Sequence, residues 1–185
     1  MTENNFKIEP RGFLFIDLQA SMEKVDRLGL LAYSSFINVC FNTLEKIRQN
    51  FPNIEVHQYA GDGVILTWTA TETTAQAIAC FQQFLNALEA EASFFEEEYQ
   101  TTPSFSAAIN WGEAVESSLG GFRVFYGNAI NSTARLQSLC SHYEQNLILG
   151  EAVLTACPGL ELVYLNRVYL KGMTTAMEIY GLPDN

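Results

Sequence analysis

Two aspartates in the sequence have the side chains that a hard metal ion needs. Asp17 follows an apolar run at residues 12–16 (GFLFI), and Asp62 lies between two glycines at residues 61–63 (GDG). Carboxylate oxygens are ligands that Mg²⁺ and Mn²⁺ prefer. A Gly-Asp-Gly sequence alone indicates only a turn with a solvated tip, so a metal site requires a fold that brings the two aspartates together.

The spacing of apolar residues predicts the order strand, helix, strand, strand, helix, strand over the first 111 residues. The predicted elements are a strand at 12–18, an amphipathic helix at 23–49, a hairpin of strands at 54–60 and 64–69, a helix that starts near Thr71 or Thr73 and continues to the acidic residues 96–98, and a strand at 105–111. This order is that of the ferredoxin-like fold, an α+β arrangement with a βαββαβ core.

Right-handed crossovers fix the strand order in this fold, with the third strand antiparallel between the first two. The carboxyl end of the first strand and the tip of the hairpin then lie at the same edge of the sheet. We therefore expect Asp17 and Asp62 to converge.

Further elements follow the core. They are a strand at 123–126, a helix at 128–141, a short strand at 147–149, a short helix at 151–156, and a final hairpin of strands at 160–170 and 176–182. Asn131 and Arg135 are four residues apart and so share one face of their helix. No repeat or linker interrupts the chain, which predicts a short lead at 1–11 and a single domain at 12–185.

The composition limits the possible partners and compartments. A net charge of −11 and a pI of about 4.5 argue against nucleic acid or an anionic membrane surface as a partner. A polyphosphate ligand would then need metal cations or locally placed basic residues. No apolar run reaches membrane-spanning length, and the four separated cysteines are typical of small buried residues in a reducing compartment. We expect a cytoplasmic protein.

Five blocks of the sequence resemble the class III nucleotidyl cyclase catalytic domain, in the family's order and spacing. They are residues 15–18 (FIDL), 61–63 (GDG), 108–113 (AINWGE), 126–136 (YGNAINSTARL) and 170–173 (LKGM). The block at 126–136 is the most specific of them. Together they cover nearly the whole chain, and they imply a cyclase domain with the α+β fold predicted above.

The resemblance implies a cyclisation of a nucleoside triphosphate, in which the ribose 3′-oxygen attacks the α-phosphorus and expels pyrophosphate. Asp17 and Asp62, with the backbone carbonyl of Leu18, would hold two Mg²⁺ or Mn²⁺ ions. One ion would lower the pKa of the 3′-hydroxyl, and the other would neutralise the leaving pyrophosphate. These ions would also supply the local positive charge that a polyphosphate ligand needs in so acidic a protein.

The resemblance further implies roles for three residues of the later blocks. Asn131 would orient the ribose, Arg135 would stabilise charge on the α-phosphate, and Lys171 would contact the terminal phosphates. In this family the aspartate pair and the Asn/Arg pair come from different subunits, which implies a homodimer. Each residue also has a structural alternative: Asp17 as a helix cap, Arg135 as a surface residue, Lys171 as a turn residue.

The turn after Asp17 departs from the family pattern. The family usually continues Ile-x-Gly-Phe-Thr, whereas residues 18–22 here are LQASM. Ala20 stands at the position of the glycine. Alanine is acceptable there unless the backbone requires a positive φ.

The residues that would select the nucleobase also depart from the family. Members that use ATP usually carry Lys and Asp at two positions where this chain has Gln58 and Val124, and members that use GTP carry Glu and Cys. A bacterial branch that makes cyclic CMP or cyclic UMP as an antiviral signal lacks these purine selectors. Tyr59 could narrow the pocket to pyrimidine size or face the core instead. Purine and pyrimidine substrates both remain open.

A hypothesis of another class is an inactive, cyclase-like module that binds a nucleotide or regulates a partner. The retained Asp17, Asp62, Asn131, Arg135 and Lys171 favour the enzyme. The altered turn and the missing selectors favour the module.

Overall fold

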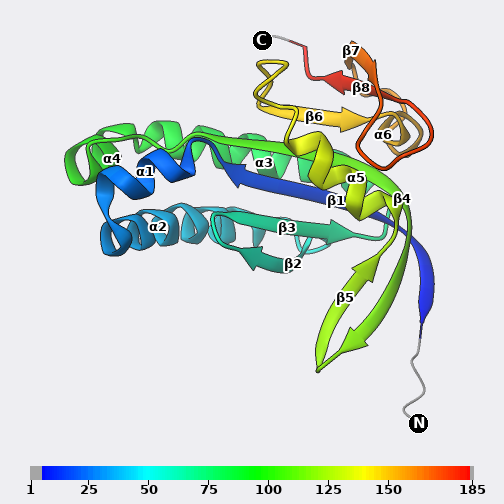
Figure 1. The fold of residues 1–185 in the computed structure, drawn as a ribbon, viewed down its shortest axis with the longest axis horizontal. Coiled ribbons are helices and arrows are strands. Elements are labelled where there is room, and N and C mark those ends of the chain that lie inside the picture. The colour runs from blue at the N-terminus through cyan, green and yellow to red at the C-terminus, as the bar shows by residue number, and fades with distance from the viewer. Residues whose placement is uncertain (1–5, 184–185) are drawn as a thin grey trace.

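A mixed sheet of eight strands runs through the molecule in a computed structural model that describes residues 6–183 (Figure 1). The strands are β1 (Lys7–Leu18), β2 (Glu55–Ala60), β3 (Gly63–Trp68), β4 (Phe105–Leu119), β5 (Phe122–Tyr126), β6 (Leu147–Gly150), β7 (Val163–Val168) and β8 (Met177–Gly181). The helices are α1 (Ser21–Leu28), α2 (Leu30–Arg48), α3 (Thr73–Ala90), α4 (Ala92–Tyr99), α5 (Asn128–Gln137) and α6 (Ala152–Ala156).

The strand order is β2-β3-β1-β4-β6-β8-β7, and β5 pairs with β4. β3 lies antiparallel between β1 and β2, and β4 lies antiparallel on the other side of β1. This part of the sheet has the predicted ferredoxin-like topology, so the predicted α+β fold class is confirmed. β6 then adds parallel to β4, and the β7–β8 hairpin extends that side.

The two faces of the sheet follow from the alternation of side chains along β1. Leu14 and Ile16 belong to the main core, which α2 and α3 cover. Phe13 and Phe15 point the other way and pack with residues of β5 and α5. By the same alternation, Asp17 lies on the face that carries α5.

Both long helices that the sequence predicted are divided in the structure. The helix expected at 23–49 breaks at Gly29, whose φ of 74° lies outside the helical region, so that α1 and α2 replace it. The second helix breaks at Glu91 into α3 and α4, and the acidic residues 96–98 belong to α4. Helical periodicity continues across such a break, so the pattern of apolar residues did not reveal it.

Two strands are longer than the sequence predicted. β1 begins at Lys7 rather than at residue 12, and β4 continues to Leu119 rather than ending at 111. These extensions pair with each other and with β5 and form an arm that projects from the sheet (Figure 1). Arg11 is buried at its base, where it pairs with Glu9 and Glu116. The extensions contain many polar residues, so a prediction based on runs of apolar residues did not detect these parts of the strands.

The C-terminal part differs from the expectation mainly in its boundaries. α5 ends at Gln137 rather than at 141, and β7 and β8 are shorter than the predicted strands.

All four cysteines are free, and Cys40, Cys80 and Cys140 are buried, which raises their thiol pKa values to about 12, 11 and 11. Among residues 6–183, no helix combines the length and the hydropathy that crossing a membrane requires.

Candidate active site

Asp17 and Asp62 converge where β1 ends and the β2–β3 turn begins, as the predicted topology requires. Asp17 is the cross-strand partner of Gly63, and the Leu18 amide donates a hydrogen bond of 3.2 Å to the Asp62 carbonyl oxygen. Gly61 gives the turn its positive φ of 63°. Both carboxylates are half-buried.

Gly63 has a role that the sequence reading missed. A Cβ atom at this position would lie 2.8 Å from Oδ1 of Asp17, closer than real Cβ contacts allow. The Asp17 carboxylate therefore occupies the space that a side chain at position 63 would fill. The sequence identified this glycine only as part of a turn, because its contact depends on the register between β1 and β3.

The electrostatics of the two aspartates suit a bound cation. Burial raises the pKa of Asp17, and the nearby Asp62 carboxylate raises it further. Tyr33 of α2 lies near both carboxylates. Burial raises the pKa of Tyr33, and the charges of Asp62 and Asp17 raise it further. The ion pairs found among residues 6–183 include neither aspartate. A divalent ion would supply the missing positive charge.

The described residues bring no third His, Cys, Asp or Glu into such a cluster. Further metal ligands would have to be backbone carbonyls, water or substrate oxygens. The Leu18 carbonyl stays a predicted ligand. Oxygen donors of this kind fit Mg²⁺ and Mn²⁺.

Removing the Asp17 charge should stabilise the metal-free protein. Because the pKa of Asp17 is higher in the folded chain than in the unfolded chain, its stabilising contribution is complete at low pH and is lost as the pH rises through the folded value. At neutral pH we therefore expect Asp17→Asn to raise the Tm measured in EDTA. Mn²⁺ should raise the Tm of the parent but not that of the variant. A variant that melts below the parent in EDTA would contradict this expectation.

The turn that follows Asp17 forces Ala20 into the left-handed region, with φ 54° and ψ 40°. Glycine, which the family usually has at this position, adopts a positive φ without steric cost, whereas alanine does not. The Lys24 side chain donates a hydrogen bond of 3.1 Å to the Gln19 carbonyl and so lies over the turn. The turn keeps its shape at the cost of backbone strain at one alanine.

Ala20→Gly should relieve that strain. A left-handed alanine costs about 1–2 kcal/mol, and the greater freedom of glycine in the unfolded chain offsets about 0.4–1 kcal/mol of the gain. We expect a Tm increase of up to about 6 °C, measured by thermal unfolding. A decrease in Tm would show that the alanine methyl group contributes more than its conformation costs.

A cavity of about 670 Å³ opens next to Asp17. Ala20, Ser106 and Gln137 contribute to its wall, and its side chains within residues 6–183 include no Lys or Arg. Ser106 is the β4 residue paired with Asp17, and its Oγ accepts a hydrogen bond of 3.1 Å from Gln137 Nε2. The cavity thus extends from Asp17 to the last turn of α5.

α5 carries the other predicted group of site residues. Asn131 is exposed and Arg135 is half-buried, one turn further along the helix. Gly172 lies beside the Arg135 guanidinium, because a Cβ there would be 3.6 Å from Nη2. The fold therefore brings the exposed Lys171 turn next to Arg135, although 36 positions separate Arg135 from Lys171 in the sequence.

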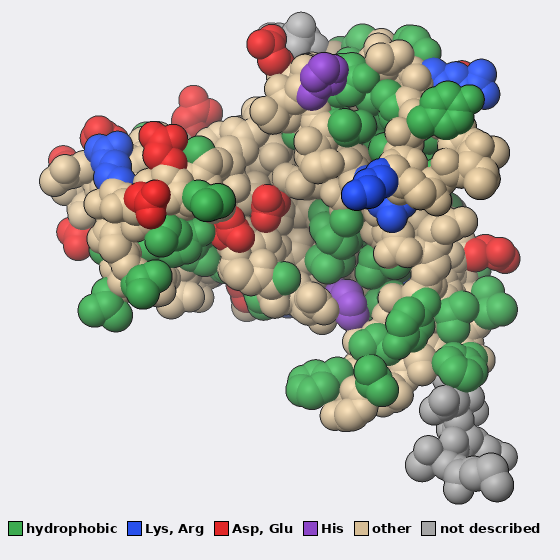
Figure 2. Space-filling model, viewed as in Figure 1, with side chains coloured by type: hydrophobic (Ala, Val, Ile, Leu, Met, Phe, Trp, Pro, Cys, Tyr) green, Lys and Arg blue, Asp and Glu red, His purple; other side chains and the backbone are tan. Residues whose placement is uncertain are grey.

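The aspartate group and the α5 group are separate patches on one face of the chain. Figure 2 shows acidic side chains over the end of β1 and the β2–β3 turn, and basic side chains over α5. The predicted metal ligands and the predicted catalytic residues thus lie in two patches of a single chain.

The three predicted base-selecting residues do not come together. Tyr59 pairs with the core residue Val64 and packs on Phe41 of α2, with ring centroids 5.1 Å apart, so it lies on the sheet face opposite α5. Gln58 is exposed and pairs with Ile65, whose side chain belongs to the α5 face. Val124 is half-buried in the arm.

Known proteins with a related sequence or with the same fold include cyclases. No protein-family model matches the chain. It is 28% identical over 151 residues to adenylate cyclase 2 of Rhizobium meliloti (strain 1021), which covers 79% of this chain and 41% of that protein. The chain thus spans less than half the length of this curated relative.

Solved structures with the same fold include two cyclases. The adenylyl cyclase CyaB from P. aeruginosa superimposes with a TM-score of 0.86 at 16% identity, covering 98% of this chain and 97% of that one. The guanylyl cyclase Cya2 superimposes with a TM-score of 0.82 at 19% identity, covering 95% of this chain and 92% of that one. These findings confirm the resemblance seen in the sequence motifs: this chain has the fold of the class III nucleotidyl cyclase catalytic domain.

Proposed function

We propose that the protein is a nucleotidyl cyclase that converts a nucleoside triphosphate into a 3′,5′-cyclic nucleotide and pyrophosphate. The observation that carries the proposal is the convergence of Asp17 and Asp62, two half-buried carboxylates with no basic partner among the described residues. A pair of carboxylates in this state suits divalent cations. The fold and the adenylyl and guanylyl cyclases that share it support the same reaction.

Asp17, Asp62 and the Leu18 carbonyl would hold two Mg²⁺ or Mn²⁺ ions. When bound, such ions lower the pKa of a coordinated hydroxyl and neutralise a leaving pyrophosphate. The cavity beside Asp17 is large enough for a polyphosphate chain, and its wall supplies hydrogen-bonding groups from Ser106 and Gln137. Its lack of described basic side chains leaves charge neutralisation at this half-site to the metal ions.

The α5 half-site would act on the sugar and the phosphates. The forked Arg135 guanidinium can donate two hydrogen bonds to oxygens of the α-phosphate as charge develops there. Asn131, exposed one turn earlier, can hold the ribose. Lys171 can contact the terminal phosphates from the turn beside Arg135.

Two copies of the chain would form the complete sites. A two-fold axis that sets the aspartate patch of one copy against the α5 patch of the other makes two equivalent sites at once. The separation of the two patches on one face supports this arrangement (Figure 2).

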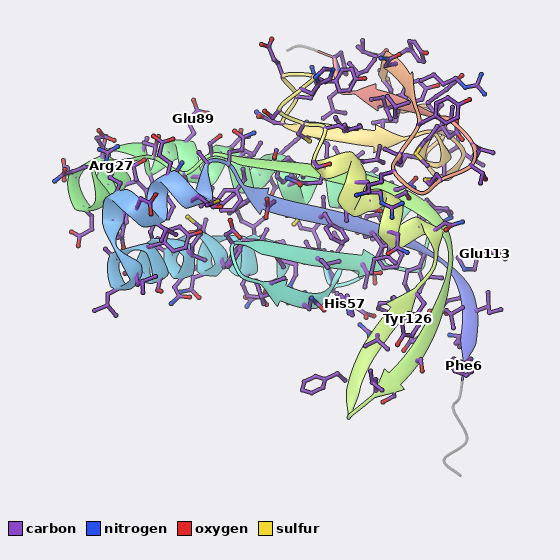
Figure 3. All side chains as sticks on the ribbon, in the orientation of Figure 1. Phe6, Arg27, His57, Glu89, Glu113 and Tyr126 are labelled. Atoms are coloured by element: carbon purple, nitrogen blue, oxygen red, sulfur yellow. The ribbon has the colours of Figure 1, made fainter. Side chains whose placement is uncertain are left out.

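The arm offers apolar surface for such a homodimer. Ile8, Leu119 and Phe122 are 67%, 65% and 76% exposed. Phe6 and Tyr126 are also exposed on the same part of the molecule (Figure 3). Contiguous exposed apolar surface of this kind marks a protein interface more often than free surface.

The nucleobase remains part of the proposal. Gln58 is exposed on the α5 side of the sheet, and its amide can both donate and accept a hydrogen bond. Neither Gln58 nor Val124 matches the purine patterns, so a pyrimidine substrate (UTP or CTP) is the alternative to ATP or GTP.

Substituting Gln58 should change the preference among nucleotides. Gln58→Leu removes one or two hydrogen bonds to the base, so kcat/KM for the preferred nucleotide should fall about 2–10-fold while that for poor substrates changes little. Tyr59→Phe keeps the packing on Phe41 and serves as the matched control. A uniform loss across all four nucleotides after the Gln58 substitution would remove this residue from base selection.

The experiment that tests the proposed function is direct. Purified protein is incubated with each of the four nucleoside triphosphates and with Mg²⁺ or Mn²⁺, and products are identified by mass. We expect one or more cyclic nucleotides and an equal amount of pyrophosphate. If no cyclic nucleotide forms from any of the four, the enzyme hypothesis fails.

The strained Ala20 turn and the cavity without described basic side chains favour the second candidate, a catalytically silent nucleotide-binding module. Nucleotide that raises the Tm without being turned over would support it. Product formation would exclude it.

A further inference from the structure

α5 is fastened to the sheet by a buried hydrogen bond between two polar side chains. Asn110 of β4 donates from Nδ2 to Ser132 Oγ at 2.7 Å, and Ser132 donates from Oγ to the Ala129 carbonyl at 3.0 Å. Asn110 and Ser132 are 2% and 1% exposed. Two side chains so deeply buried in a helix–sheet contact would ordinarily be apolar.

Ser132 takes part in both hydrogen bonds of this contact. Its hydroxyl accepts from the Asn110 amide and donates to the Ala129 carbonyl. Asn110 Oδ1 is buried without a partner and lies against Gly150, where a Cβ would be only 2.5 Å away. The Asn110 side chain therefore fills the space that a side chain at position 150 would need.

Apart from the hydrogen bond between Gln137 and Ser106 at the last residue of the helix, the other contacts of α5 with the sheet have no such direction. Ala129 and Leu136 pack against apolar side chains of the sheet. Apolar packing resists separation of two elements but orients them less strictly than a hydrogen bond, whose energy depends on angle as well as on distance.

We propose that Asn110 is a positioning residue, which sets the rotation and axial position of α5 and thereby the placement of Asn131 and Arg135. Ser132 is the neighbour of Asn131 and lies three positions before Arg135. A shift of Ser132 therefore moves both residues. The inference rests on the proposed function, in which these two side chains meet the substrate across the dimer.

The expected effect is on kcat. A displacement of about 1 Å at a catalytic group can cost about 100-fold in rate. Substrate affinity should change little, because the metal half-site and Lys171 lie on other elements. Removal of the Asn110 hydrogen bond is therefore expected to lower kcat about 30- to 100-fold with KM within about 3-fold.

Three variants separate positioning from stability. Ser132→Ala leaves the Asn110 amide buried and unpaired, so both Tm and kcat should fall. Asn110→Leu/Ser132→Ala removes both polar groups, which should return the Tm to near that of the parent, while kcat stays low. Leu88→Ala in α3, on the opposite face of the sheet, lowers the Tm through a cavity and should leave kcat unchanged.

Hydrogen exchange of the amides at 128–137 supplies a readout that does not depend on activity. In the double variant these amides should exchange at least 10-fold faster than in the parent, although the Tm is restored. Recovery of kcat together with the Tm, or unchanged exchange in α5, would overturn the proposal. A parent protein that makes no cyclic nucleotide would defeat the proposed function, whereas the exchange experiment would still decide whether Asn110 fixes α5.

Discussion

Mixing Asp62→Asn with Arg135→Ala should restore activity to two proteins that are each nearly inactive alone. Each substitution removes a charge from both sites of its homodimer, and we expect a loss of at least about 1000-fold for either. In the mixed dimer, however, both defects fall in one site. The other site receives the intact Asp62 of one chain and the intact Arg135 of the other.

Random exchange of subunits makes half of the dimers mixed, each with one intact site of two, so the mixture should recover roughly a quarter of the parent activity. A mixture of Asp62→Asn with Asp17→Asn is the matched control. Each site of the mixed dimer then has one altered aspartate pair, so no dimer contains an intact site. Cyclic nucleotide formation and light scattering are measured at equal dimer concentration. If the first mixture stays as inactive as the control, the shared site is wrong.

Gly63→Ala should inactivate the protein without unfolding it. Its Cβ would lie 2.8 Å from Asp17 Oδ1 and 3.3 Å from the Ile16 carbonyl oxygen, so the carboxylate must rotate away. The backbone of Gly63 does not have a positive φ, and alanine can adopt it. We expect kcat to fall about 100-fold or more, together with loss of the Tm increase that Mn²⁺ gives the parent.

Gly159→Ala is the control for replacing a glycine as such. Gly159 has a φ of 94° and nothing within 4 Å of an added Cβ. Its substitution should lower the Tm through backbone strain and leave both kcat and the response to Mn²⁺ unchanged. A Gly63→Ala protein that keeps the Mn²⁺ response would show that Asp17 does not need the space above Gly63.

Some features of the site depended on backbone detail that residue identity does not carry. Ala20 lies in the left-handed region only because the chain must turn sharply after β1, and an alanine in the sequence gives no sign of it. Tyr59 faces α2 because a register shift between Val56 and Gln58 sets which side of the sheet each following residue takes. The sequence left both orientations of Tyr59 open.

The sequence did not predict the arm either, because its formation also depends on the tertiary structure. Its strands leave the core and pair with each other, and the residue that anchors them is the buried cation Arg11. Its guanidinium lies 4.5 Å from the centre of the Phe125 ring. A search for strands by apolar content excludes such a residue from the interior, because a buried charge is stable only with partners that the tertiary structure supplies.

The sequence by itself determined the order of the core elements and the meeting of Asp17 with Asp62. Local periodicity specifies the elements, and the handedness of crossovers leaves one arrangement for them. Only the tertiary structure decided what surrounds these aspartates: the space above Gly63, the strained Ala20, and the Asn110 amide that holds α5. Each of these depends on strand register and on packing between segments distant in the chain, and such contacts form only when the whole sheet is assembled.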